Sequence, residues 1–308
     1  MLDHETTSDC LKLIALAMTE DIGAANIATG VDCTTDAIVP TDTFARASLV
    51  SRAAGIVCGI EVCQLAIHHF SSRLKLDVMV ADGGTIEPQQ TIATFAGPAR
   101  DILIMERTCL NFLGRLSGIS SLTRQFVSAV AGTGAQVFDT RKTTPGWRRL
   151  EKYAVACGGG YNHRMGLYDA VLIKDNHLAF FSSQLDDPQT TIPRAIELAR
   201  QWIVANQSEL PRGNQTVVQL EVDTLEQLEI GLKTTCDIIL LDNMTPALMR
   251  QAVQMRNQLA PQMLLEASGG VNLRTIRSIA ETGVERISVG ALTHSAINFD
   301  IGLDWNFA

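Results

Sequence analysis

The chain has 308 residues, of which 46% are hydrophobic and 19% charged, and its formal net charge is −8 at pH 7. This composition is typical of a globular protein rather than of a disordered or fibrous one. The acidic balance argues against broad binding to nucleic acid or acidic membranes. The seven cysteines are scattered without a C-x-x-C pair, and neither a signal-peptide pattern nor an apolar run of roughly 18 residues is present, so we expect a cytoplasmic protein with reduced thiols.

The first third of the sequence predicts a small domain that mixes helices and strands. Residues 8–21 have the apolar spacing of an amphipathic helix, and Ser8 is a candidate N-cap. Short strand and helix patterns follow, bounded by glycine turns, at 44–51, 60–70, 74–80 and 91–97. We therefore assign residues 1–115 to an N-terminal domain.

The rest of the sequence alternates strand and helix patterns. Residues 101–130 predict one or two helices, interrupted near Ser117-Gly118, that join the two parts of the chain. Aliphatic or β-branched runs then recur, most of them followed by a helical pattern, at 135–142, 169–176, 216–223, 236–243, 262–270 and 285–292. Strands that alternate with helices form βα units, so we expect a parallel sheet over residues 116–294.

Polar or glycine residues stand at the end of each apolar run. They are Thr140, Arg141, Lys142, Lys174, Glu221, Asp242, Ser268, Gly269, Gly270 and Gly290. In an α/β barrel the carboxyl ends of all strands open onto one face, so these residues would meet although they are far apart in sequence. An open doubly wound sheet would gather ligands only around its switch point. The number of such strand ends favours the barrel.

The later strand ends suit a phosphorylated sugar. Ser268 to Gly270 and Gly290 follow the last two strands, where barrels often hold a phosphate on backbone N–H groups, although they are also ordinary turn residues. Glu221 and Asp242 suit sugar hydroxyls or Mg²⁺, or are solvated strand-end carboxylates.

The earlier strand ends are rich in cations. Arg141, Lys142 and Arg164 suit carboxylates and phosphates. A predicted helix follows Arg141 and Lys142, and we expect its cations to be solvated surface charges: Arg148, Arg149 and Lys152.

Two other chemistries remain open from the residues alone. Cys157, His163 and His177 are candidate metal ligands, but they lack the short spacings that such sites usually have. Lys174 ends a buried-looking run and is a candidate Schiff-base lysine, as in barrel aldolases. That alternative leaves the arginines unexplained.

The sequence resembles the quinolinate phosphoribosyltransferase family, the carboxylating nicotinate-nucleotide pyrophosphorylases of NAD synthesis. The resemblance spans almost the whole chain in order, and its most specific block is the 39-residue stretch that begins at Asp139, DTRKTTPGWRRLEKYAVACGGGYNHRMGLYDAVLIKDNH. Other matching stretches are ERTCLNFLGRLSGIS, LEVDTLEQL, DIILLDNM, LEASGGV and GVERISVGALTHSA.

The resemblance implies an N-terminal α/β sandwich domain over 1–115 and an incomplete α/β, TIM-like barrel over 116–294. A C-terminal tail, about 295–308, would pack back on the first domain. The family works as a dimer or a multiple of one, so a homodimer or hexamer is implied, with Arg107 contributed across the subunit interface. The implied reaction joins quinolinate to phosphoribosyl pyrophosphate (PRPP) with Mg²⁺ and yields nicotinate mononucleotide, pyrophosphate and carbon dioxide.

The resemblance also implies a role for each strand-end residue. Catalytic roles fall to Lys142, Lys174, Glu221 and Asp242, and the last two would hold Mg²⁺ directly or through water. Substrate-binding roles are implied for Arg107, Thr140, Arg141, Lys142, His163, Arg164, Lys174, Glu221, Asp242, Ser268, Gly269, Gly270, Gly290 and His294.

Some alternatives remain within the same fold. One is a phosphoribosyltransferase that acts on nicotinate or another aromatic acid, and another is a catalytically silent paralogue. No strand-end charge is missing, which argues against the silent paralogue. Trp147 and Tyr161 depart from the residues that are common in the family, and either could reshape the edge of the pocket.

Overall fold

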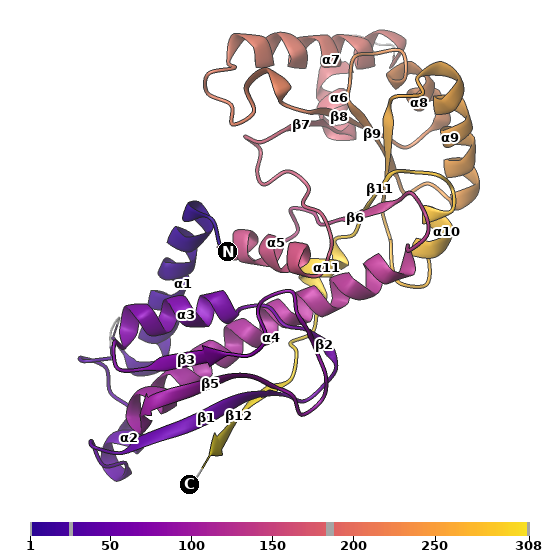
Figure 1. The fold of residues 1–308 in the computed structure, drawn as a ribbon. Coiled ribbons are helices and arrows are strands. Elements are labelled where there is room, and N and C mark those ends of the chain that lie inside the picture. Colours follow the sequence, from indigo (N-terminus) through magenta and orange to yellow (C-terminus); the bar gives the residue numbers. More distant parts are fainter. Residues whose placement is uncertain (1, 25–26, 183–187, 307–308) are drawn as a thin grey trace. The chain divides into compact units, whose positions relative to one another are not determined.

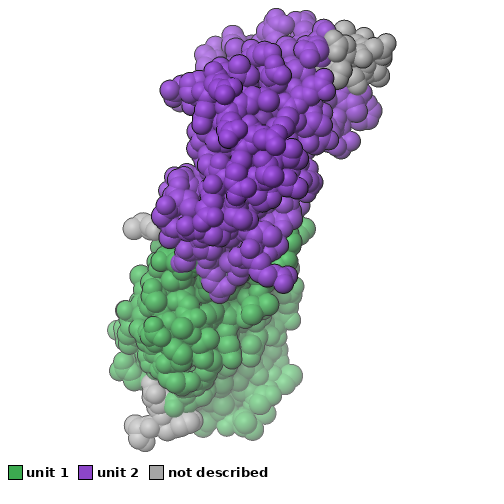
Figure 2. Space-filling view, turned by 90° about the vertical axis from the view of Figure 1, so that its right-hand side faces the viewer, with its two compact units in different colours: residues 1–124, 143–159, 292–308 green, residues 125–142, 160–291 purple. Residues whose placement is uncertain are grey.

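The computed structural model describes residues 2–24, 27–182 and 188–306. The chain forms two compact units, which Figure 2 colours separately. The first unit comprises residues 1–124, 143–159 and 292–308, and the second comprises 125–142 and 160–291.

The first unit is built on a four-stranded antiparallel sheet in the order β12-β1-β5-β3 (Figure 1). Its helices and strands are α1 (His4–Ile22), α2 (Cys33–Ile38), β1 (Phe44–Ser51), β2 (Gly55–Ile56), α3 (Ile60–Phe70), β3 (Lys75–Val78), β4 (Thr85–Ile86), β5 (Thr91–Pro98), α4 (Ala99–Ala129), α5 (Arg148–Cys157), α11 (Ala291–His294) and β12 (Ile301–Asn306), of which α4 and α11 extend across the unit boundary. The C-terminal strand β12 pairs with β1, with Ile301 opposite Ser51. The first and last parts of the chain therefore share one sheet.

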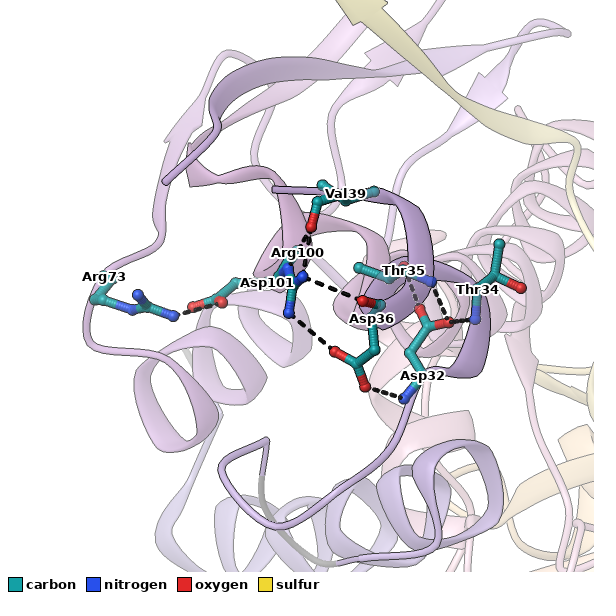
Figure 3. A network of polar contacts seen from close by, with 8 residues as sticks. All are labelled: Asp32, Thr34, Thr35, Asp36, Val39, Arg73, Arg100 and Asp101. Carbon is teal, nitrogen blue, oxygen red and sulfur yellow. Dashed lines mark hydrogen bonds and ion pairs between the residues drawn. The ribbon is translucent and has the colours of Figure 1, made fainter. Parts of the chain in front are cut away.

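Side-chain caps begin the N-terminal helices. Asp3 caps α1, since its Oδ1 accepts from the backbone N–H of Thr6 at 2.7 Å, so the predicted start at Ser8 was wrong. Asp32 caps α2 in the same way (Figure 3). Arg100 Nη1, in the first turn of α4, lies 3.1 Å from Asp36 Oδ1 of α2. This ion pair fixes the short α2 beside the start of α4.

The long helix α4 is continuous, so the predicted interruption near Ser117-Gly118 was wrong. The hydroxyl of Ser117 accepts from the backbone N–H of Cys58 at 2.9 Å and donates to its carbonyl at 3.1 Å. Gly118 faces the backbone of Ile297, and a side chain there would overlap the Ile297 carbonyl oxygen. These small residues therefore allow two extended segments to approach the helix closely, instead of ending it.

Helix α5 places its charges differently from the sequence expectation. Lys152 is fully buried, and only 20% of the Arg149 side chain is exposed. Arg149 Nε lies 3.2 Å from Asp9 Oδ2 on α1. Because α5 packs against α1, these cations face protein, and the expectation of solvated charges was wrong for both.

The second unit is a parallel α/β domain, as predicted. Its six strands follow the order β6-β11-β10-β9-β8-β7. Its elements are β6 (Gln136–Phe138), β7 (Val171–Ile173), α6 (Asp175–Ser182), α7 (Pro188–Ala205), η1 (Gly213–Gln215), β8 (Val218–Val222), α8 (Leu225–Gly231), β9 (Ile238–Asp242), α9 (Pro246–Leu259), β10 (Leu264–Ser268), α10 (Ile276–Ala280) and β11 (Arg286–Ser288). The last strand β11 pairs with the first strand β6, whereas β6 and β7 form the two edges. The sheet therefore forms an incomplete barrel, open between β6 and β7, with α7 to α10 along its outer side (Figure 1).

Candidate functional site

The strand ends of the second unit bring the predicted polar residues together. Asp242 ends β9 and lies in register with Ser268, which ends β10. Lys174 directly follows β7, and Glu221 is the penultimate residue of β8. Because parallel strands end at the same edge of the sheet, these four side chains belong to one face of the barrel, as the sequence predicted.

Lys174 and Glu221 form an ion pair at this face. Lys174 Nζ lies 2.7 Å from Glu221 Oε2 across the neighbouring strands β7 and β8. The Lys174 side chain is 42% exposed, so the cation is accessible to an anion. The carboxylate fixes where the ammonium stands before any ligand is present.

A tight glycine turn follows β10. Gly269 and Gly270 have φ angles of 97° and 61°, a region that favours glycine. Asn243, also at positive φ, donates its backbone N–H to the Ser268 carbonyl at 2.9 Å and its Nδ2 to Asp242 Oδ2 at 2.7 Å. A side chain at Gly269 would overlap the Asn243 amide. The glycines thus leave the backbone accessible beside Asp242, and Asn243 is a residue that sequence reasoning missed.

Arg141 and Arg164 lie close enough for their charges to interact. Burial lowers the pKa of Arg164, the positive charge of Arg141 lowers it further, and the carboxylate of Asp169 raises it. Arg164 Nη1 donates to the Ala170 carbonyl at 2.7 Å, which fixes the direction of the guanidinium. An arginine stays protonated despite such a shift. Two like charges held together form a site that a dianion would stabilise.

Protein groups contact both ring nitrogens of His163, one by a hydrogen bond and the other at ion-pair distance. Nδ1 accepts from the backbone N–H of Arg164 at 2.8 Å, and Nε2 lies 3.4 Å from Glu266 Oε1. The backbone N–H of His163 donates to Oδ1 of the buried Asp139 at 2.8 Å. The His163-Arg164 segment is therefore oriented by side chains of the barrel interior.

Glu266 is fully buried in the middle of β10 and was not among the predicted site residues. Burial raises the pKa of this carboxyl, but the interactions with His163, with the charge of Arg286 and with the Ser288 hydroxyl outweigh that effect and hold it at about 2. Arg286 Nε lies 2.7 Å from Glu266 Oε2, and its guanidinium stacks 3.6 Å above the Phe138 ring. The one available signal was a charged residue inside an apolar run, which requires a buried partner.

The remaining predicted residues are distributed over both units. Thr140, Lys142 and Gly290 follow β6 and β11 in the second unit, and the Thr140 hydroxyl accepts from the Lys142 backbone N–H at 3.1 Å. Arg107, on α4, and His294, on α11, are exposed residues of the first unit, and their roles stay predictions.

The carboxylates allow a test of the predicted Mg²⁺ site. Among the residues that the structure describes, no group of three or more His, Cys, Asp or Glu side chains is placed to hold a metal, so the set of Cys157, His163 and His177 gains no support. Glu221 and Asp242, on neighbouring strands, fit the usual mode of Mg²⁺, which takes one or two carboxylates and completes its shell with water and substrate phosphates.

In the described ranges no helix is long and apolar enough to cross a membrane.

Known proteins are similar to this chain in sequence and in architecture. Residues 119–304 match the model of the quinolinate phosphoribosyl transferase C-terminal domain, and residues 32–117 match that of its N-terminal domain. The chain is 42% identical over 277 residues to the carboxylating nicotinate-nucleotide pyrophosphorylase of Mycobacterium leprae, a match that covers 89% of this chain and 91% of the relative. It is 36% identical over 293 residues to the probable enzyme of that name from Bacillus subtilis, covering 95% and 92%.

The structural comparison agrees. The solved nicotinate-nucleotide pyrophosphorylase of Francisella tularensis superposes with a TM-score of 0.84 at 32% identity and covers 97% of both chains. Sequence and fold comparisons lead to proteins of the same name along nearly the whole length. On these grounds the chain belongs to the quinolinate phosphoribosyltransferase family.

Proposed function

We propose that this chain transfers the phosphoribosyl group of PRPP to quinolinate with loss of carbon dioxide, yielding nicotinate mononucleotide and pyrophosphate for NAD biosynthesis. The observation that carries the proposal is the pair of neighbouring guanidiniums, Arg141 and Arg164, in the unit whose strand ends also present Lys174. Quinolinate carries two adjacent ring carboxylates, and several cations are needed to hold them. The names of the relatives support the same reaction.

Arg141 and Arg164 bind the two quinolinate carboxylates in this proposal. Each planar guanidinium offers two parallel N–H donors to a carboxylate. His163 contributes by holding Arg164 in place, since its Nδ1 accepts from the Arg164 backbone N–H. Lys174, which directly follows β7, binds the same quinolinate dianion.

The opposite part of the barrel mouth binds PRPP. Ser268 to Gly270 and Gly290 take the 5′-phosphate on backbone N–H groups after the last two strands. Glu221 and Asp242 orient the ribose hydroxyls and stabilise positive charge that develops on the sugar as its bond to pyrophosphate breaks. Lys142, which is exposed, joins Lys174 in neutralising the leaving pyrophosphate.

Glu221 and Asp242 would also hold Mg²⁺, which supplies further neutralisation of the pyrophosphate when bound. Decarboxylation needs no protein base in this proposal. Once the ring nitrogen bears the ribose, the pyridinium accepts the electron pair that carbon dioxide leaves at the adjacent carbon. Arg141 and Arg164 keep the ring oriented during that step.

The assembly and location belong to the proposal as well. We expect a homodimer or hexamer in which Arg107 of one subunit reaches the quinolinate of another, and a cytoplasmic location. The exposure of Arg107 on α4 is compatible with a role toward a neighbouring subunit.

The decisive experiment incubates the chain with quinolinate, PRPP and Mg²⁺ and follows nicotinate mononucleotide together with released carbon dioxide. Nicotinate in place of quinolinate is the parallel reaction, because a nicotinate-specific enzyme would form the same nucleotide without releasing carbon dioxide. Product from quinolinate but not from nicotinate supports the proposal. Product only from nicotinate refutes it and leaves the related transferase. Product from neither acid refutes it and leaves the silent paralogue.

A further inference from the structure

We propose that Glu266 is a positioning residue for quinolinate binding: it orients the imidazole of His163, which in turn holds the backbone of Arg164. The expected effect on quinolinate binding rests on the proposed function. The structural part of the inference rests on the contacts of Glu266 within the second unit alone.

Both carboxylate oxygens of Glu266 are engaged by protein groups. Oε1 faces His163 Nε2 at 3.4 Å and accepts from the Ser288 hydroxyl. Oε2 faces Arg286 Nε at 2.7 Å and accepts from Gln219 Nε2 at 3.1 Å. These partners come from β8, from β11 and from the segment between α5 and β7, so the carboxylate cannot rotate without losing several contacts.

The direction of Glu266 follows from the contacts of its partner Arg286 and from the strand register. Glu285 contacts Arg256 of the outer helix α9, with Arg256 Nη2 2.7 Å from Glu285 Oε1. Glu285 directly precedes β11, and Arg286, the first residue of that strand, contacts Phe138 of β6 and Glu266 of β10 instead of that helix. Glu266 is in register with Arg286 on the adjacent strand and shares its face. The carboxylate therefore lies on the inner side of the barrel wall.

The ring of His163 transmits this orientation toward the ligand. Its Nδ1 accepts from the Arg164 backbone N–H, so the ring proton stands on Nε2, the nitrogen that faces Glu266. Without the carboxylate, the ring loses this orienting contact, and its acceptor bond to the Arg164 N–H is weakened. The guanidinium of Arg164, which we assign to a quinolinate carboxylate, would then lose its fixed direction.

A purely stabilising role explains this arrangement less well. A buried ion pair contributes little net stability compared with apolar residues of the same volume. The contact from Oε1 to the His163 ring leads to a predicted substrate residue, which a purely stabilising role does not require. An orienting hydrogen bond on the far nitrogen is how proteins fix the tautomer of a functional histidine.

The test compares Glu266→Gln with a matched control, Glu285→Gln, which removes a carboxylate that pairs with an arginine of α9 just before β11. In Glu266→Gln we expect the KM for quinolinate to rise by about tenfold or more while the KM for PRPP stays within about twofold. Glu285→Gln should leave both KM values within about twofold even if it lowers stability. An unchanged quinolinate KM in folded Glu266→Gln, or an equal rise in the control, overturns the inference.

A second readout does not depend on turnover. Nitrogen-15 NMR of the six histidines, with His163 assigned from His163→Gln, should show the Nε2–H tautomer of His163 in the wild-type chain and altered ring shifts in Glu266→Gln. Identical His163 signals in both overturn the inference. If wild-type protein makes no product from quinolinate, the proposed function fails, and these spectra still decide whether Glu266 orients His163.

A milder variant covers the case in which Glu266→Gln does not fold. Ser288→Ala removes only one donor from Oε1, the oxygen that faces His163. We expect a smaller, same-direction rise in the quinolinate KM and a shift of the His163 ring signals. No change in either quantity counts against the positioning role.

Discussion

Arg115 and Glu151 form an ion pair inside the first unit, with Arg115 Nη2 2.5 Å from Glu151 Oε1. Glu151 is fully buried, and it also accepts from the backbone N–H and the hydroxyl of Thr144 at 3.2 and 2.9 Å. Arg115 Nη1 in turn donates to the Ala296 carbonyl at 3.0 Å. One carboxylate and one guanidinium therefore connect α4, α5 and two loop segments.

Glu151→Gln should lower the free energy of unfolding by about 3 kcal/mol, because it leaves the Arg115 charge without its counter-charge. The expected loss stands at the lower end of the range for broken buried pairs, since 21% of the Arg115 side chain is exposed. Urea denaturation at pH 7 measures it. Asp101→Asn is the matched control: Asp101 is also buried, but its partner Arg73 is 62% exposed, so the loss should be clearly smaller. Equal losses would contradict the reasoning.

The buried carboxyl of Glu266 predicts a pH dependence of stability. Its pKa is about 2 in the folded chain, against an ordinary value of 4.5. Because the folded value is the lower one, the ionised carboxyl stabilises the fold above pH 4.5, and this contribution disappears as the pH falls through 4.5 toward 2. Such a shift corresponds to a contribution on the order of 3 kcal/mol at pH 7.

The measurement compares wild type with Glu266→Gln. The gap between their free energies of unfolding should shrink by about half or more between pH 7 and pH 3, since Gln mimics the protonated carboxyl at both. Other carboxyls titrate in both proteins and cancel in the difference. A gap that stays constant over this range would show that Glu266 does not carry the charge that we assign to it.

Local patterns were sufficient to predict the strand ends of the barrel. Glu221 and Asp242 each stand at or next to the end of an aliphatic run, and the alternation of strands with helices indicates a parallel sheet, in which such ends share one face. The glycines at 269 and 270 were recognisable as a turn for the same reason. These inferences need only residues that are neighbours in sequence.

Features that depend on distant partners were not predictable in this way. Glu266 stands two residues before Ser268 and was passed over, because its partners Arg286 and Gln219 lie 20 and 47 residues away. Lys152 was expected to be a solvated charge because its own helix offers no apolar cover, but tertiary packing buries it. In both cases the environment is set by other parts of the chain.

Arg141→Ala should abolish quinolinate binding while PRPP still binds, because it removes one of the two guanidiniums assigned to the dicarboxylate. Isothermal titration calorimetry with each ligand separately measures this. Arg194→Ala is the control, since Arg194 forms an exposed pair with Glu197 on α7 and should change neither affinity. Undiminished quinolinate affinity in Arg141→Ala would remove Arg141 from the site.

Gly118→Ala tests the close packing on α4. In the interior of an exposed helix this change would stabilise by about 1 kcal/mol, because alanine has the higher helix propensity. Here the added methyl would overlap the carbonyl oxygen of Ile297, so we expect the opposite sign and a loss of about 2 kcal/mol. Gly134→Ala is the control, since nothing lies within 4 Å of a methyl at that position. Thermal and urea unfolding of both variants give the signs, and a stabilised Gly118→Ala would mean that residues 297–299 do not lie against the helix in solution.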